Sequence, residues 1–263
     1  MKWTTQAEQA VSRVPFFVRR RVKKRAEEEA VQNRALEVTL EHVRSCQQKF
    51  LKNMDSEVKG YRVETCFGPN GCPNRAVADD DLAGDLERIA SQRNLRAFLK
   101  ERVQGPLKMH HEFRISVSDC PNACSRPQIV DIGLIGASLP RLSQEECSRC
   151  EACVQVCKED AVSLPEEAPA PVIDYHRCVA CGRCISVCPT ATLQEDVKGY
   201  RILVGGKLGR HPQLGTEIDG VYSKEDALKV VEKCLDHYMS QNRHGERFGE
   251  ILNRTGTEFL HEM

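Results

Sequence analysis

The sequence lacks the features of an exported or membrane-spanning protein. Its first ten residues, MKWTTQAEQA, contain no apolar stretch of the kind that forms the core of a signal peptide. No apolar run approaches the ~18 residues that a membrane helix needs. We therefore expect a cytoplasmic protein with no membrane span. In that compartment disulfides rarely persist, and cysteine clusters usually bind metal or carry redox chemistry.

An excess of charge of either sign is also missing. Lys plus Arg number 38 and Asp plus Glu number 38, so the net charge indicates no particular partner. The one uneven stretch is 13–25, with seven basic residues and no acid, followed by three glutamates at 27–29. No nucleic-acid-reading motif accompanies this charge, so we expect a solvated helix face and no nucleic-acid partner.

The spacing of apolar residues predicts the elements of an α+β protein. Trp3, Ala7, Ala10 and Val14 recur at helical spacing up to Pro15, and Thr39 is a suitable cap for a later helix, so residues 1–55 should form a small helical domain. Alternation predicts strands at 61–64, 113–117 and 200–204, and the apolar run 129–135 predicts a buried strand. Residues 82–103 should be helical, and Ser223 should begin a last helix.

A cysteine-rich segment, 140–196, separates two of these predicted strands. We therefore expect one α+β domain made of 56–139 and 197–263, interrupted by this insertion. Eight of the 14 cysteines fall within it, in two runs with the same spacing of two, two and three intervening residues. The runs are Cys147, Cys150, Cys153 and Cys157, then Cys178, Cys181, Cys184 and Cys188.

The doubled run has the ligand spacing of bacterial two-cluster ferredoxins. In such proteins the fourth cysteine of each run reaches across to the other cluster. The crossing predicts one [4Fe-4S] ligand set of Cys147, Cys150, Cys153 and Cys188, and a second of Cys178, Cys181, Cys184 and Cys157. Structural zinc and disulfides are the alternatives, but zinc sites typically use two ligand pairs with a longer gap between them.

Four further cysteines form a second constellation outside the insertion. They are Cys66 and Cys72, separated by five residues, and Cys120 and Cys124, in the sequence Cys-Pro-Asn-Ala-Cys. Each pair follows a predicted strand. By spacing alone, the four thiols suit a [4Fe-4S] cluster somewhat better than zinc.

This second constellation resembles the siroheme–[4Fe-4S] motif of sulfite and nitrite reductases. The surrounding HHEFRISVSDC (110–120), IVDIG (129–133) and GGKLGRHP (205–212) agree with it, and the insertion resembles that of dissimilatory sulfite reductases. The likeness runs from about residue 56 to the C-terminus. It implies three [4Fe-4S] clusters, a siroheme, and a Cys124 thiolate shared between the third cluster and the siroheme iron.

The resemblance implies an oxidoreductase that reduces a small oxyanion, sulfite first and nitrite second, with electrons from a donor protein. It identifies no catalytic side chain. Members of that family usually contain two copies of the siroheme unit, and this chain has one, which favours a homodimer or a homologous partner subunit. The alternatives are a non-catalytic electron carrier and a reductase acting on a tetrapyrrole.

The last of these alternatives rests on the N-terminal segment. Its sequence, including VPFFVR (14–19), is similar to the helical domain that ends the protochlorophyllide reductase B subunit. That likeness implies a role beside a tetrapyrrole, whereas a helical docking domain with a basic face is the simpler interpretation.

Several other side chains are candidates for lesser roles. An anionic haem and an oxyanion need cations, and the nearest in sequence to the motifs are Arg62, Arg75, Arg126, Lys207 and Arg210. For each of them an ordinary surface charge is the simpler interpretation. His110 and His111 are potential proton donors, although a strand-edge position without a catalytic role is simpler. Cys46 and Cys234 belong to no motif and are expected to be buried free thiols on helices.

Overall fold

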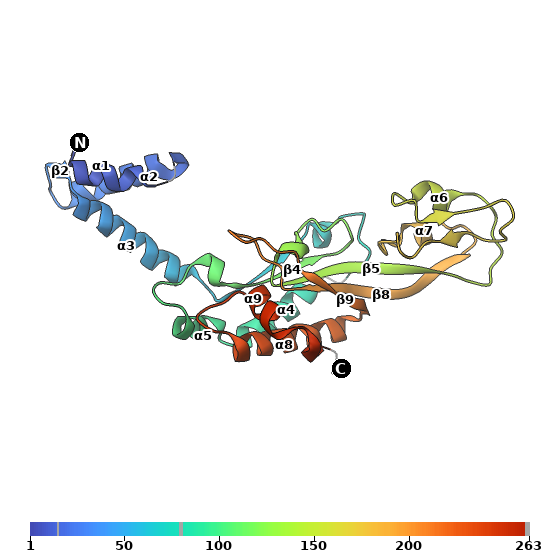
Figure 1. Cartoon of the computed structure of the whole chain (residues 1–263). Coiled ribbons are helices and arrows are strands. Elements are labelled where there is room, and N and C mark those ends of the chain that lie inside the picture. The colour runs from blue at the N-terminus through green and yellow to red at the C-terminus, as the bar shows by residue number, and fades with distance from the viewer. Residues whose placement is uncertain (15, 79–80, 261–263) are drawn as a thin grey trace. The chain divides into compact units, whose positions relative to one another are not determined.

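The computed structural model describes residues 1–14, 16–78 and 81–260, with the side chains of residues 17 and 51–54 also outside the description. The chain folds into two compact units (Figure 1). One consists of Met1–Lys59 and Val103–His110, and the other of Gly60–Arg102 and His111–Met263. The break expected at Pro15 lies outside the described residues.

The first unit is helical. It contains α1 (Thr5–Ser12), α2 (Phe16–Gln32) and α3 (Leu40–Glu57), with a parallel two-residue pairing of β1 (Lys2–Trp3) and β2 (Glu37–Val38). The Thr4 hydroxyl accepts a hydrogen bond from the backbone N–H of Ala7 and so caps α1. Small and β-branched side chains fill its core: Ala7, Val11, Ala26, Ala30, Val38 and Val43. Trp3 lies in β1, not in the first helix, because the chain there pairs with β2.

The second unit is built on a five-stranded mixed sheet of order β3-β4-β5-β8-β9. The strands are β3 (Tyr61–Thr65), β4 (Phe113–Ser118), β5 (Ile132–Leu142), β8 (Leu193–Val204) and β9 (Thr216–Tyr222). β3, β4 and β5 are parallel, whereas β8 is antiparallel to both of its neighbours. This mixture of parallel and antiparallel pairs with helices confirms the α+β class.

Helices cover the sheet and complete the core. They are α4 (Leu82–Gln92), α5 (Leu95–Arg102), α8 (Lys224–Gln241) and α9 (Phe248–Thr255). The rings of Phe113 on β4, Tyr238 on α8 and Phe248 on α9 pack together, with centroids 4.9 and 5.4 Å from that of Phe113. Ser223 caps α8 as predicted, since its hydroxyl accepts from the backbone N–H of Asp226.

Two boundaries predicted from the sequence are wrong. The single helix expected at 82–103 is broken into α4 and α5, because Asn94 adopts a left-handed conformation with φ of 45°. The strand expected at 129–135 begins only at Ile132, after a short 3-10 helix at Pro127–Ile129. It then continues to Leu142, because pairing with β8 extends it past Gly136.

The cysteine-rich segment lies between β5 and β8, at the far end of the two long strands (Figure 1). It contains α6 (Ala152–Val156), α7 (Arg183–Ser186) and a small antiparallel pair of β6 (Val162–Ser163) and β7 (Val172–Ile173). A backbone bond from Ser138 N–H to the carbonyl of Ala180 joins it to the sheet. Three more 3-10 helices occur at Gly68–Asn70, Met109–His111 and Glu258–Leu260. Among the described residues, no helix is long and apolar enough to cross a membrane.

Candidate metal centre

The ends of two neighbouring parallel strands bring four cysteines together. Cys66 follows β3 directly, and Cys120 comes two residues after the end of β4. Because β3 and β4 run parallel, their carboxyl ends meet at one edge of the sheet, and the backbone N–H of Cys66 donates to the carbonyl of Val117 at 2.9 Å. Cys72 and Cys124 close the two turns that follow these strands.

A cavity of about 410 Å³ lies against these four thiols. Thiols of the cysteine-rich segment line the same cavity. The eight cysteines that share it are Cys66, Cys72, Cys120, Cys124, Cys157, Cys178, Cys181 and Cys184. The fold thus places the sheet-edge constellation next to one of the two ligand sets predicted in the insertion.

The thiols of Cys66, Cys72 and Cys124 lie close enough to Cys120 to influence its ionisation. Burial raises the pKa of the Cys120 thiol, and the charges of Cys66, Cys124 and Cys72 raise it further. Such a group of thiolates needs a cationic partner to remain ionised together, which a metal cluster supplies. The residues present therefore fit a [4Fe-4S] cluster.

Hydrogen bonds to sulfur point to the same chemistry. The backbone N–H groups of Gly68 and Asp119 donate to Cys66 Sγ at 3.2 and 3.4 Å. The Asn122 amide donates to Cys124 Sγ at 3.0 Å. In the insertion, backbone N–H groups likewise donate to Cys147, Cys157, Cys178 and Cys188. N–H donors of this kind stabilise the charge on cluster ligands and adjust the cluster's potential.

Backbone conformation repeats between the two cysteine runs of the insertion. Three pairs of residues with positive φ are each separated by 31 positions, as are the runs themselves: Arg149 and Ala180, Glu151 and Gly182, Asp160 and Ala191. Non-glycine residues rarely adopt this conformation, and it turns successive N–H groups toward a common anionic centre. The insertion therefore contains two copies of one cysteine loop.

The thiols near Cys153 and Cys184 include one from the other cysteine run in each case. Burial raises the pKa of Cys153, and the charges of Cys188 and Cys147 add to this effect. Burial raises the pKa of the Cys184 thiol to about 12, with further contributions from Cys178, Cys181 and Cys157. Cys188 thus lies near Cys153 and Cys147, and Cys157 lies near Cys184. The ligand assignment itself remains a prediction.

Cys188 differs from these thiols. Burial opposes its ionisation, but hydrogen bonds from Leu193 and Thr190 outweigh that effect and lower the pKa of the Cys188 thiol.

A site for a single metal ion is not found among the described residues. No three His, Cys, Asp or Glu side chains in the described part of the chain converge closely enough to hold a single metal ion.

A buried ion pair joins the two sheet-edge turns. Arg75 Nε lies 2.7 Å from Asp119 Oδ2, and the two side chains are 16% and 5% exposed. The carbonyl of Asp119 also accepts from the backbone N–H groups of Ala76 and Val77. Sequence reasoning singled out Arg75 but missed Asp119, because no local pattern relates residues 44 positions apart.

Comparison with known proteins agrees with this geometry. Residues 61–263, well over half of the chain, match the family described as the nitrite and sulphite reductase 4Fe-4S domain. The chain belongs to this family. Residues 3–46 match the proto-chlorophyllide reductase 57 kD subunit.

Curated relatives of this reductase-family chain include two described as sulfite reductases. A coenzyme F420-dependent sulfite reductase of Methanocaldococcus jannaschii is 34% identical over 201 residues, which cover 75% of this chain and 30% of the relative. One of the subunits of the anaerobic sulfite reductase of Salmonella typhimurium is 27% identical over 105 residues, covering 40% of this chain and 26% of that subunit. The chain thus spans about a third or less of these relatives.

A solved structure supports the fold. Dissimilatory sulfite reductase I (DsrI) superposes with a TM-score of 0.52 at 20% identity, covering 82% of this chain and 56% of that one. Both the resemblance stated from the sequence and the fold class are therefore confirmed.

The five candidate cations of this reductase-family chain differ in their ion pairs and exposure. Arg62 pairs with Glu64 at 2.6 Å, and the buried Lys207 pairs with Glu250 at 2.7 Å. Arg75 is held by Asp119. Arg126 and Arg210 are exposed, and among the described residues neither has an ion pair.

The two candidate histidines and the two remaining cysteines have the following places in the fold. His110 and His111 lie on the 3-10 helix before β4, and neither is among the described residues that line the cavity. Cys234 is fully buried on α8, as expected. Cys46 is only partly buried, so the expectation of a buried thiol there is wrong: it lies on the side of α3 that faces a groove.

Proposed function

We propose that the chain is the iron–sulfur and siroheme subunit of a sulfite reductase, with nitrite as the alternative substrate. The observation that carries this proposal is the cavity in which the sheet-edge thiols meet those of the insertion. Two cluster sites that border one cavity would be neighbours, an arrangement suited to passing an electron from one to the other. Family membership supports the class of reaction.

Three groups of residues would hold three [4Fe-4S] clusters. Two are the crossed sets of the insertion, and the third is Cys66, Cys72, Cys120 and Cys124. The clusters, when bound, supply one-electron transfer. The protein's own contribution is the set of N–H donors to sulfur and the partial burial of the thiols, which adjust each site's potential.

The cavity also suggests an order for the three sites. Its lining includes Cys157, Cys178, Cys181 and Cys184, whereas the lining residues within the described chain include none of Cys147, Cys150, Cys153 and Cys188. The first of these sets is therefore the neighbour of the sheet-edge set. Electrons from a donor protein would enter at the Cys147 set, whose Cys150 is exposed.

Cys124 is the candidate siroheme ligand. It is exposed, whereas Cys66, Cys72 and Cys120 are half-buried, so of the four it is the most accessible to a second large group. The exposed Arg126, two residues away, and Arg210 suit the carboxylates of a siroheme or an oxyanion. Siroheme, when bound, supplies an iron with a face open to substrate.

A visible spectrum of anaerobically purified protein tests this proposal. Siroheme has its own absorption bands, whereas clusters alone give a broad brown shoulder. Three clusters predict about twelve iron atoms per chain, and siroheme adds one. Iron near eight with zinc present would refute the third cluster.

A non-catalytic electron carrier is the second candidate. The observation behind it is that the same twelve thiols could hold three clusters without a siroheme. The same spectrum decides between them, because a carrier would have the iron of three clusters and no siroheme bands.

A further inference from the structure

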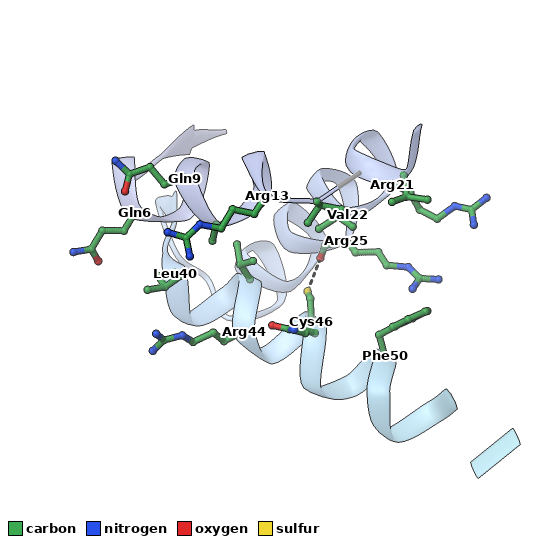
Figure 2. Close-up of a pocket in the computed structure, with 15 residues that line it drawn as sticks. Gln6, Gln9, Arg13, Arg21, Val22, Arg25, Leu40, Arg44, Cys46 and Phe50 are labelled. Atoms are coloured by element: carbon green, nitrogen blue, oxygen red, sulfur yellow. Dashed lines mark hydrogen bonds between the residues drawn. The ribbon is translucent and has the colours of Figure 1, made fainter. Parts of the chain in front are cut away.

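The helical unit contains a groove of about 810 Å³ (Figure 2). Helices α1 and α2 form one wall and α3 the other, and the lining is mostly apolar. None of the cysteines assigned to clusters lines it. The groove is therefore a candidate binding site distinct from the cluster sites.

The groove is elongated along α3. Leu40, Val43, Arg44, Gln47 and Phe50 line it at spacings of three and four residues, so one face of three successive turns borders the space. At 1.5 Å per residue, this stretch is about 15 Å long. Val18, Arg21, Val22 and Arg25 present a matching stripe from α2. Two helical stripes flanking an apolar trough form the receptor of helix-in-groove recognition.

The charge of the groove is of one sign. Arginines stand on both walls, Arg13, Arg21 and Arg25 on one and Arg44 on the other (Figure 2). No aspartate or glutamate is among the described lining residues. Arg25 lies over the Phe50 ring at 5.8 Å. Within the described chain, Arg13, Arg21 and Arg44 have no ion pair and are exposed, so their charges are available to a ligand.

We propose that this groove binds a short amphipathic helix of a partner protein, about three turns long, whose apolar stripe is flanked by Asp or Glu. The trough would bury the apolar stripe, and the arginines on both walls would pair with the flanking acids. A hydrated polyanion such as nucleic acid does not suit this site, because its backbone has nothing to place against the apolar floor. The charge of the walls selects an acidic helix over a basic one.

A labelled peptide tests the proposal. The probe is a fluorescein-labelled 14-residue peptide with Leu at positions 2, 6, 9 and 13 and Glu on both flanks, titrated with the full cluster-loaded chain in anaerobic fluorescence anisotropy. Saturable binding is expected. Arg21→Ala with Arg44→Ala should weaken it about tenfold or more, because one charge is lost from each wall.

A second pair of substitutions is the matched control. Arg20 and Lys24 are exposed on α2 but do not line the groove. Arg20→Ala with Lys24→Ala removes the same net charge and should leave affinity within about twofold. Equal weakening by both pairs would show non-specific attraction and overturn the proposal.

Cys46 provides an independent readout. Its half-exposed thiol lines the groove and donates to the Arg25 carbonyl at 3.3 Å. A bound helix should slow its alkylation, measured by peptide mass spectrometry, and a peptide with Lys in place of Glu should not. The proposal fails if the acidic peptide does not bind, or if dodecanoate or a single-stranded oligonucleotide binds through Arg21 and Arg44 while the peptide does not.

Discussion

Asp119 connects the two turns that bear the sheet-edge cysteines. Its backbone N–H donates to Cys66 Sγ, its carbonyl accepts from Ala76 and Val77 beyond Cys72, and its carboxylate pairs with Arg75. Each contact joins the strand that leads to Cys120 with the loop that contains Cys66 and Cys72. Asp119 therefore helps to hold the loop of Cys66 and Cys72 against the turn that begins at Cys120.

Arg75→Ala should disturb the sheet-edge site. It leaves the Asp119 carboxylate, 5% exposed, without its cation, which typically costs about 3–5 kcal/mol. We expect a lower denaturation midpoint and the loss of up to about four iron atoms per chain, with the insertion's clusters retained. Denaturant unfolding and iron analysis measure both effects.

Arg62→Ala is the control for this substitution. Arg62 also pairs with a carboxylate, that of Glu64, but the two side chains are 44% and 30% exposed. Solvent screens such a pair, and its loss should cost less than about 1 kcal/mol with no loss of iron. Equal effects of the two substitutions would show that the buried pair does not support the site.

Cys124→Ser and Cys150→Ser should differ in their spectra. If Cys124 is shared between a cluster and siroheme, its loss removes the bands of both. Cys150→Ser should damage one cluster of the insertion and leave the siroheme bands largely intact. Visible and electron paramagnetic resonance spectra of the two variants measure the cluster and siroheme signals. Loss of the same signals in both variants would refute the bridging role of Cys124.

Among the secondary-structure elements, β5 allows the loops after β4 to pack against it at two glycines. A Cβ atom at Gly136 would lie 2.4 Å from the carbonyl oxygen of Asp119, and one at Gly133 would lie 2.1 Å from that of Pro127. The turn that contains Cys120 and Cys124 thus lies directly over a strand that has no side chains at these points. Only glycine permits this approach.

Gly136→Ala should therefore destabilise the fold by roughly 1–3 kcal/mol, since backbone atoms must move apart. Gly84→Ala is the matched control. A Cβ there meets nothing within 4 Å, and its position inside α4 should make the change stabilising by up to about 1 kcal/mol. Both values come from anaerobic denaturant unfolding of the full chain, and a neutral Gly136→Ala would show that the strand and turn can separate freely.

For the whole molecule, the number of siroheme units matters. Siroheme reductases usually contain two copies of the siroheme unit, and this chain contains one. A siroheme is large, and its anionic rim needs cations and walls on more than one side. We expect a symmetric pair of chains or a complex with a homologous subunit. Light scattering of the siroheme-loaded protein measures this, and a stable monomer that keeps its haem and reduces sulfite would contradict it.

Features that depend on local spacing could be predicted from the sequence. The repeated cysteine runs, the helix starts at Thr39 and Ser223 and the alternation of the strands involve residues a few positions apart, where bond geometry restricts the outcome. Other features became visible only in the folded chain: which cysteines of the insertion line the cavity at the sheet edge, where Arg75 finds its partner, and that Cys46 borders a groove. These features join residues tens of positions apart, and strand pairing and helix packing, which no local pattern encodes, bring such residues together.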